Sequence, residues 1–391
     1  MPRDVLVCGA GIGGLAAGLA LARRRIRVRI LERAERLEEV GAGLQLSPNA
    51  VRVLRALGLE DEVRSTAFEP EDAVVRDGRT GRVQLRVPLK GACERRHGAP
   101  YLQTHRADLH AVLRRACEAA GVEIALGRDV LRYETGPRAA LLTARERFEA
   151  DAVIGADGLR SAIRAQMTRG PAPRFTGQVA WRAVVPAHAL AAGTIPPDAT
   201  SWTGPGRHLV TYYLRGGAFI NVVAVEERAG FAAEDWRQAG DPAALKAAFA
   251  GWDPRLLALL DAVETPFLWG LFDHPPLASW TDGAVALLGD AAHPMLPFLA
   301  QGAAMALEDA WVLAAMLSGA DDVPSALRRY GAIRRPRTTR VQRMSAANRA
   351  IFHAGKGPAH LPARLARGAA RLAPGLAGRR LAAVYGHDVT D

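Results

Sequence analysis

The sequence contains only three cysteines, Cys8, Cys93 and Cys117, and they are widely separated. An odd and scattered set of this kind builds neither a disulfide framework nor a metal site, and it is typical of a protein in a reducing cytoplasm. The ten histidines form no HExxH or paired-ligand arrangement, so no metal is expected. No secretory leader precedes the first apolar segment, and no uncharged apolar run is long enough to span a membrane. We therefore expect a cytoplasmic protein without a membrane partner.

Acidic and aromatic residues are also scarce relative to basic ones. There are 40 acids against 51 lysines and arginines, which gives a net charge of +11, and aromatic residues make up 6% of the chain. Such an excess is found in proteins that bind nucleic acid or membrane surfaces. However, no nucleic-acid-binding module is recognisable, and the densest basic cluster, residues 328–343, predicts an exposed helical face interrupted at Pro336. We expect no nucleic-acid partner and a solvated charge that attracts anionic cofactors and substrates.

The chain opens with a strand, a glycine-rich turn, a helix and a second strand. The apolar run Val5–Cys8 leads into Gly9, Gly11 and Gly14 in the spacing GxGxxG. The first glycine permits a tight turn, the second a close approach of a pyrophosphate, and the third close packing of helix on strand. Glu32 ends the second strand, where a carboxylate accepts hydrogen bonds from ribose hydroxyls. This segment predicts a bound dinucleotide and leaves open whether it is FAD or NAD.

The 391 residues are too many for one small core and predict either two domains or one large α/β domain with a substantial insertion. We expect a Rossmann-like dinucleotide-binding domain with an inserted β-sheet domain for the substrate and a helical C-terminus. The predicted boundaries are 1–170 for the first part of the dinucleotide-binding domain (with a β-rich excursion at about 68–100), 171–277 for the inserted sheet, 278–350 for the second part of the first domain, and 351–391 for the helical C-terminal segment.

Two further turns repeat the pattern of an apolar strand, a glycine or aspartate turn, and a helix. They contain Asp157-Gly158 and Gly289-Asp290. In a parallel sheet, the loops at the carboxyl ends of the strands meet at one crevice, and ligands bind there. Asp157 taken alone is equally well explained as an ordinary helix N-cap. Together with the first turn, however, the two motifs predict a single shared site.

These three motifs in this order resemble those of the class A flavoprotein aromatic hydroxylases, the single-component FAD monooxygenases. The similarity rests on GAGIGG with Glu32, on the Asp157-Gly158 motif, on the tail GDAAHPMLPFLAQG, and on Arg106 in HRADLH. It extends from about residue 4 to residue 350, and it is greatest to the 3-hydroxybenzoate 6-hydroxylase, 6-hydroxynicotinate 3-monooxygenase and salicylate hydroxylase branch. The fold that it implies is the GR2-type flavoprotein fold. The absence of a second GxGxxG unit suits this family, in which NAD(P)H visits a groove.

The resemblance implies FAD and NAD(P)H as cofactors, and it assigns cofactor contacts to this chain residue by residue. The glycine turn would hold the pyrophosphate, Glu32 the adenosine ribose, Arg106 the phosphate or ribityl chain, and Asp290 the ribityl hydroxyls. The tail after Asp290 would run along the flavin ring. The full expected set comprises Gly9, Gly11, Ile12, Gly13, Gly14, Glu32, Arg33, Gln45, Arg106, Val130, Asp157, Gly158, Gly289, Asp290, Pro297, Gln301, Gly302 and Ala303.

His208 and Tyr212 are the candidate catalytic residues, together with Gln301. They are four residues apart in RHLVTYY, so on a strand both side chains point to the same face. A phenol reacts faster with an electrophilic oxygen donor once it is deprotonated, and histidine titrates near neutrality. In the resembled branch a His and a Tyr with this spacing lie at the substrate, with a Gln at the position of Gln301. A strand histidine and a packed tyrosine without catalytic role remain the alternative.

The resemblance therefore implies a monooxygenase that uses NAD(P)H and O₂ to hydroxylate a small hydroxylated aromatic acid through a flavin hydroperoxide. We expect a monomer or homodimer. Three alternatives remain open from the sequence. One is an FAD-dependent epoxidase or tailoring hydroxylase that acts on a larger polycyclic or isoprenoid substrate. The others are a plain NAD-dependent dehydrogenase and a basic nucleic-acid-binding protein that retains a nucleotide.

Overall fold

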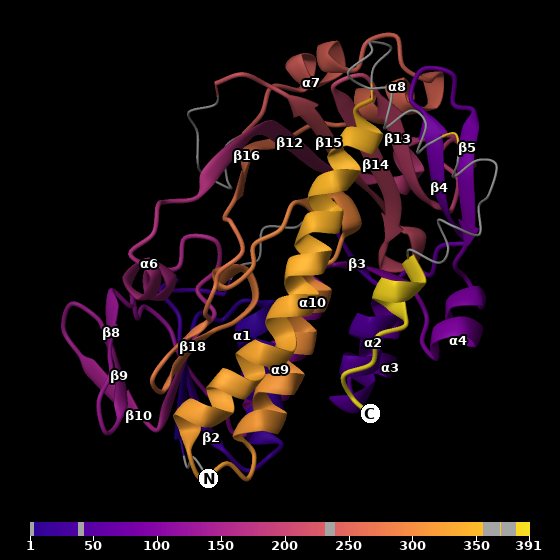
Figure 1. Cartoon of the computed structure of the whole chain (residues 1–391). Helices are drawn as coiled ribbons and strands as arrows, with labels where there is room; N and C mark the ends of the chain where they lie inside the picture. Colours follow the sequence, from indigo (N-terminus) through magenta and orange to yellow (C-terminus); the bar gives the residue numbers. More distant parts are fainter. Residues whose placement is uncertain (1–3, 38–42, 231–238, 355–367, 369–380) are drawn as a thin grey trace.

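The computed structural model describes residues 4–37, 43–230, 239–354, 368 and 381–391. Figure 1 shows an α/β body that contains the N-terminal strands, and a second β-sheet that lies at its far end. The long helix α10 (Val323–Phe352) runs from the body to this second sheet. No described helix combines the length and the apolar content that crossing a bilayer requires.

A six-stranded sheet forms the centre of the α/β body, in the order β17-β18-β11-β1-β2-β7. Its strands are β1 (Asp4–Cys8), β2 (Arg27–Leu31), β7 (Glu123–Ala125), β11 (Ala152–Gly155), β17 (Thr281–Asp282) and β18 (Val285–Leu287). All neighbours pair in parallel except β17 with β18. The short apolar runs of β1, β11 and β18 are buried, as expected for parallel strands that are covered on both faces. The predicted Rossmann-like α/β fold is thereby confirmed.

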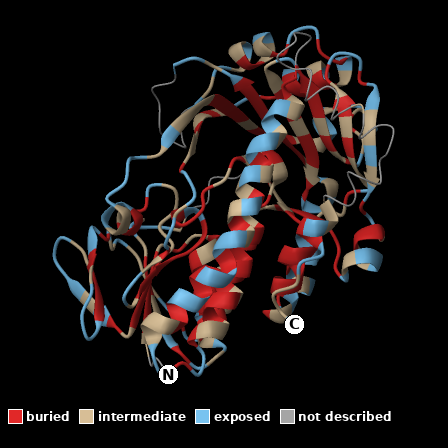
Figure 2. Ribbon diagram, viewed as in Figure 1, coloured by how far each residue is buried: buried red, intermediate tan, exposed pale blue. Residues whose placement is uncertain are grey.

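Helices and small sheets surround this centre. The helices are α1 (Ile12–Ala22), α2 (Pro48–Ala56), α3 (Glu60–Thr66), α4 (Ala92–His97), α5 (Arg106–Ala119), α6 (Ala162–Thr168) and α9 (Gly302–Leu317). One small sheet pairs β3 (Gly43–Leu46) with β6 (Leu102–His105), and another joins β8 (Arg132–Glu134), β9 (Ala139–Leu142) and β10 (Arg147–Ala150). Helices α1 and α9 are buried along most of their length, α9 visibly so in Figure 2.

The second sheet has seven strands in the order β16-β12-β15-β14-β13-β4-β5. They are β4 (Asp72–Asp77), β5 (Val83–Pro88), β12 (Arg174–Pro186), β13 (Ala199–Gly204), β14 (Arg207–Leu214), β15 (Phe219–Glu227) and β16 (Phe267–Asp273). The β-rich excursion that the sequence assigned to the first domain therefore supplies β4 and β5 to this inserted sheet, because β4 pairs in parallel with β13. One face of the sheet packs in a common core with α7 (Pro242–Ala248) and α8 (Pro254–Asp261).

Helix α10 runs unbroken through Pro336, so the predicted interruption at that residue is wrong. An interior proline removes one backbone hydrogen bond and costs about 3 kcal/mol in a helix. Residues on both sides of it, among them Arg334 and Thr338, are buried, and this packing holds the helix together across the proline. Most of the predicted C-terminal segment, 351–391, lies outside the described residues, although residues 381–385 are helical.

Arg334 also departs from the expectation that its basic cluster forms a solvated face. It is fully buried and forms ion pairs with Glu308 and Asp309 of α9, each at 2.7 Å. Burial by itself would raise the pKa of Asp309, but His293 and Arg334 hold it below its ordinary value. The cluster therefore contains a buried charge network that joins α10 to α9.

We predict that Arg334→Met lowers the free energy of unfolding by about 3–5 kcal/mol, because two buried carboxylates would lose the cation that they share. Urea unfolding followed by circular dichroism measures this change. The matched control is Arg335→Met at the exposed neighbouring position, for which we expect a change within about 0.5 kcal/mol. Equal effects of the two substitutions would contradict a stabilising role for the buried network.

Candidate active site

The three glycine and aspartate turns lie side by side at one edge of the six-stranded sheet. Gly9 follows β1, Asp157 follows β11 and Gly289 follows β18, and these strands are neighbours in the order β18-β11-β1. Backbone hydrogen bonds join the strand ends, from Ala156 N–H to the Cys8 carbonyl and from Leu288 N–H to the Gly155 carbonyl, at 2.8 and 2.9 Å. The predicted convergence of the three motifs is thus present in the structure.

A cavity of about 340 Å³ lies at these turns. Eight of the residues predicted to contact the cofactor line it, namely Gly9, Gly11, Glu32, Arg33, Arg106, Val130, Asp157 and Gly158. Further lining residues that the sequence did not single out include His110, Arg128, Asp129 and Arg160. His110 ends the segment HRADLH and Arg160 follows the Asp157-Gly158 motif, whereas Arg128 and Asp129 belong to no motif and reach the turn only through the fold.

Each of the three motif glycines has a distinct geometric reason. Gly9 has φ +102°, and a Cβ there would lie 2.6 Å from the Ala156 carbonyl oxygen. A Cβ on Gly14 would lie 1.9 Å from the carbonyl oxygen of Gly9, so only glycine allows α1 to start this close to the turn. A Cβ on Gly11, by contrast, would meet no atom of the described residues within 4 Å. Because Gly11 lines the cavity, its missing side chain leaves space for a ligand at the N-terminus of α1.

Acidic side chains surround the same cavity. Glu32 accepts hydrogen bonds from the N–H groups of Ala10 at 2.7 Å and Ala34 at 2.9 Å, so the turn itself fixes its carboxylate. Asp157 accepts from the N–H of Ile163 through Oδ2 at 3.3 Å. Its Oδ1 is buried and has no hydrogen-bond partner among the described residues. Burial raises the pKa of Asp157, and a ligand hydroxyl or amide at Oδ1 would satisfy the orphaned atom.

The GD motif and its tail continue from β18. Asp290 is solvent-accessible, yet burial raises its pKa, while His293 and Arg106 act in the opposite direction. A side chain that is surrounded by protein and still accessible faces an internal space, and the influence of Arg106 places that space beside the cavity. The tail passes through a 3-10 turn at Pro297 and then starts α9 at Gly302 and Ala303, where the first N–H groups of the helix are free to bind an anion.

His208 and Tyr212 lie on the same face of β14, as predicted. The cross-strand pairs His208–Val225, Val210–Val223 and Tyr212–Asn221 place three rows of side chains on this face. It is the face turned toward the tail, because His208 packs edge-on against Phe298 with ring centroids 5.3 Å apart. A Cβ on Gly43 of β3 would lie 2.4 Å from the Tyr212 ring, so that ring rests on the β3 backbone.

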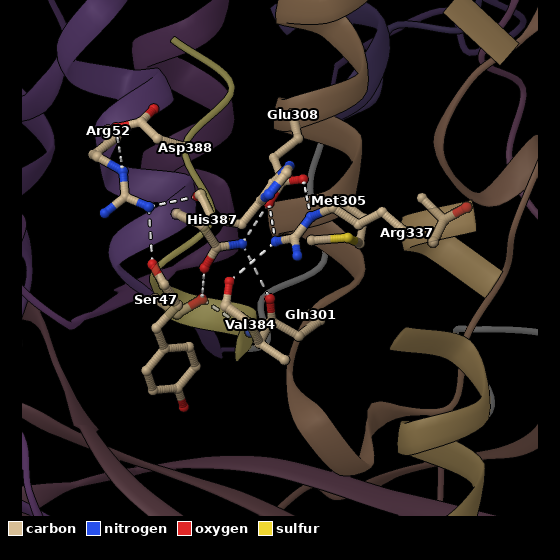
Figure 3. A network of polar contacts seen from close by, with 12 residues as sticks. Ser47, Arg52, Gln301, Met305, Glu308, Arg337, Val384, His387 and Asp388 are labelled. Atoms are coloured by element: carbon tan, nitrogen blue, oxygen red, sulfur yellow. Dashed lines mark hydrogen bonds and ion pairs between the residues drawn. The ribbon is translucent and has the colours of Figure 1, made fainter. Parts of the chain in front are cut away.

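Gln301 was expected to orient the substrate, but its amide is held by protein groups (Figure 3). Its Nε2 donates to the Ser47 hydroxyl at 2.9 Å, and its Oε1 accepts from the Asn49 amide at 3.3 Å. Asn49 also donates to Glu308 at 2.7 Å. The Gln301 side chain is buried, so its observed contacts fix the start of α9 beneath the tail.

The same network reaches the C-terminal residues (Figure 3). Arg337 binds Glu308 through two hydrogen bonds of 2.6 Å and also donates to the Val384 carbonyl at 3.0 Å. Arg52 of α2 forms an ion pair with Asp388 at 2.8 Å. The last described residues therefore tie α2, α9 and α10 together near Gln301.

Sequence reasoning missed Arg182 of β12. It pairs with Val223 on the sheet, so it lies on the same face as His208 and Tyr212, between their two rows. Its guanidinium stacks on the Trp269 ring at 4.5 Å, and burial lowers its pKa to about 10. Among the described residues it has no carboxylate partner within ion-pair distance, and its Nε has no hydrogen bond. The signal in the sequence that could have found it is a single arginine within the otherwise uncharged strand QVAWRAVV.

With this geometry in place, a comparison with known proteins identifies the family. The family described as FAD binding domain matches residues 3–204 and 273–345. The chain belongs to this family. It is 40% identical over 91% of its length to a 3-amino-4-hydroxybenzoate 2-monooxygenase of Streptomyces cremeus, of which 90% is covered. It is 38% identical to a 3-hydroxybenzoate 6-hydroxylase of Aquipseudomonas alcaligenes, with 92% of each chain covered.

Solved structures of FAD proteins have the same fold. The Klebsiella pneumoniae protein HpxO, complexed with FAD and uric acid, superposes with a TM-score of 0.84 at 27% identity and 95% coverage of both chains. A salicylate hydroxylase substrate complex superposes with a TM-score of 0.83 at 25% identity, covering 99% of this chain and 96% of that one. The expected membership of the class A FAD-dependent hydroxylases is confirmed, and the cofactor is FAD.

The residues of this chain fit FAD on their own geometry. The open space at Gly11, the unpartnered Oδ1 of Asp157 and the accessible Asp290 lie at the three turns where the pyrophosphate, hydroxyl and ribityl groups of a dinucleotide need partners. Glu32 is held at the end of β2, where its carboxylate can accept from a ribose. We propose that the predicted cofactor residues at these turns hold FAD in these positions.

We predict that Gly11→Ala raises the Kd of FAD by roughly tenfold or more, equal to at least about 1.4 kcal/mol, because its methyl group would occupy the pyrophosphate space. The apoprotein should keep its thermal stability, since that methyl meets no atom within 4 Å in the described part of the chain. Fluorescence titration of the apoprotein with FAD measures the Kd. Gly136→Ala is the matched control, because a Cβ there meets only the Arg138 carbonyl at 3.4 Å. Unchanged FAD affinity in Gly11→Ala would contradict the assignment.

Proposed function

We propose that this protein is an FAD-dependent monooxygenase that uses NAD(P)H and O₂ to hydroxylate a small hydroxylated aromatic acid. The observation that carries the proposal is the sheet face that is turned toward the tail after Asp290. Between the rows of His208 and Tyr212 it presents the cation Arg182, which has no carboxylate partner among the described residues. A substrate with one carboxylate and one acidic hydroxyl on a flat ring has the groups that such a face can bind.

The names of the relatives support the same class of substrate. They act on 3-amino-4-hydroxybenzoate, 3-hydroxybenzoate and, in a 36% identical protein of Bordetella bronchiseptica, 6-hydroxynicotinate. These compounds share a six-membered aromatic ring with one carboxylate and one hydroxyl group. We infer that the carboxylate of the substrate binds Arg182, which stays protonated at neutral pH because its pKa of about 10 lies well above 7.

His208 is suited to accept the proton of the substrate hydroxyl. Burial and the neighbouring His353 hold the pKa of His208 well below its ordinary value, so its ring is neutral at pH 7 and has one nitrogen free to accept. Deprotonation raises the electron density of the ring carbons ortho and para to the hydroxyl. The Tyr212 ring, packed on Gly43, would lie beside the bound aromatic ring and keep water away from it.

When bound, FAD supplies the electron transfer from NAD(P)H and the activation of O₂. The protein's own residues position the aromatic ring, remove its hydroxyl proton and exclude solvent from the reaction.

The proposal is tested with the purified holoenzyme and a panel of 3-hydroxybenzoate, 3-amino-4-hydroxybenzoate, 6-hydroxynicotinate and salicylate, each with NADH and with NADPH. We expect at least one compound to stimulate pyridine-nucleotide oxidation and to yield an equal amount of hydroxylated product. Product is measured by chromatography and peroxide by a coupled assay. Failure of every compound, together with turnover of a larger polycyclic phenol, would instead indicate a tailoring hydroxylase.

Arg182→Met tests the carboxylate contact, since methionine keeps an apolar chain on Trp269 but removes the charge. Loss of a hydrogen bond to a charged group costs about 1.5–3 kcal/mol, so we expect a Kd for 3-hydroxybenzoate that is roughly 10 to 100 times higher. The Kd for 3-hydroxybenzamide should change little. Arg174→Met, on the exposed part of the same strand, is the control. Equal weakening of the acid and the amide would contradict the assignment of Arg182.

A further inference from the structure

Three titratable side chains form a continuous hydrogen-bonded row from the sheet face to the protein surface. His208 Nδ1 lies 2.7 Å from His353 Nε2, and His353 Nδ1 lies 3.1 Å from Glu227 Oε1. His208 and His353 are buried, whereas the Glu227 side chain is 43% exposed. The row therefore begins at the proposed substrate site and ends in solvent.

The structure builds this row from separate parts of the chain. His208 is on β14 and Glu227 ends β15, while His353 directly follows α10. The carbonyl of His353 accepts from the N–H of Gly206, in the turn between β13 and β14, at 3.1 Å. This contact fixes the end of α10 against the sheet and sets the His353 ring between the other two residues.

The carboxylate at one end determines the tautomer of both rings. Glu227 accepts at 3.1 Å, so His353 Nδ1 carries the hydrogen and its Nε2 is an acceptor. The Gln178 amide lies 3.4 Å from the same Nδ1, and its otherwise unpartnered oxygen accepts from this hydrogen when the amide is turned over. His208 Nδ1 must then donate to that acceptor, which leaves His208 Nε2 as a bare lone pair. Among the described residues, Nε2 of His208 has no hydrogen-bond partner. The nitrogen that remains is thus the one that accepts a proton from a ligand.

The charges around the row support its direction. Burial lowers the pKa of His353, while Glu227 acts to raise it and Arg349 and Arg207 act to lower it. Burial by itself would raise the pKa of Glu227, but His353 and Arg349 hold it below its ordinary value, with Arg349 Nε at 3.4 Å. Both rings are therefore neutral at rest, and the acid at the outer end is ionised and ready to accept.

We propose that His353 and Glu227 form a proton relay that carries the hydroxyl proton of the substrate from His208 to solvent. The substrate O–H proton passes to His208 Nε2, the Nδ1 proton of His208 passes to His353 Nε2, and the Nδ1 proton of His353 passes to Glu227 and then to water. The proton returns by the same atoms when the hydroxylated ring recovers its aromaticity, which restores both tautomers. His353 is a positioning residue that acts through His208, and the inference rests on the proposed function.

The test uses the holoenzyme and 3-hydroxy-4-nitrobenzoate as probe, because ionisation of a nitrophenol changes its colour without any turnover. Titration of the bound probe by absorbance gives the pKa of its hydroxyl. In the wild type we expect a pKa below that of the free probe. His353→Gln should raise the bound value toward the free one and lower kcat for 3-hydroxybenzoate at pH 7 by roughly 100-fold, the scale of a general base. His208→Gln should have the same effect.

The controls separate this role from a structural one. His188→Gln changes an exposed histidine of the same sheet domain in the same way and should alter neither quantity. Added imidazole should restore part of kcat in His353→Ala. It should not restore kcat in His208→Ala, in which His353 is intact. A His353→Gln enzyme that keeps FAD, the wild-type probe pKa and the wild-type pH profile of kcat would overturn the relay. If no panel compound is hydroxylated, the proposed function is wrong. The probe titration needs no turnover, so it still shows whether His353 and Glu227 form a relay.

Discussion

The buried ion pairs between Arg334 and the adjacent acids Glu308 and Asp309 are the constraint on which the rest of the site depends. Asp309 also accepts from the N–H of Gly289, at 3.1 Å, and binds His293, so it fixes both ends of the GD turn. Glu308 accepts from Asn49, which in turn holds the amide of Gln301. One arginine thus positions the turn, the tail and the start of α9. The fold can keep these charges fully buried only because each of them has a partner of opposite charge.

The second determinant is the meeting of two surfaces with different chemistry. The α/β body contributes backbone turns, which suit phosphates and hydroxyls, and the inserted sheet contributes side chains in regular rows. Phe298 of the tail after Asp290 lies against His208, so this tail and the sheet face form one site. Helix α10 joins the two parts, since its middle carries Arg334 and its end delivers His353 to the sheet. The helix that stabilises the fold therefore also completes the proposed catalytic row.

Motifs with local causes could be predicted from the sequence, and contacts between distant segments could not. The glycine turn, Glu32 and the common face of His208 and Tyr212 follow from backbone geometry and strand periodicity, and the structure has them as expected. The continuity of α10 through Pro336 and the burial of Arg334 depend on packing against α9, which no local pattern encodes. The same holds for β4 and β5 in the inserted sheet. His353 ends a helix about 145 residues from its partner, so nothing near it in the sequence signals a role.

The central claim is that this fold transfers one oxygen atom from O₂ to a hydroxylated aromatic acid. Turnover of 3-hydroxybenzoate, or of whichever panel acid stimulates NAD(P)H oxidation, under ¹⁸O₂ tests it most directly, with mass spectrometry of the product. The account predicts a product that contains a single ¹⁸O atom on a ring carbon ortho or para to the original hydroxyl, formed in proportion to the NAD(P)H consumed. A product without label, or NAD(P)H oxidation that yields only labelled peroxide for every acid, would contradict it.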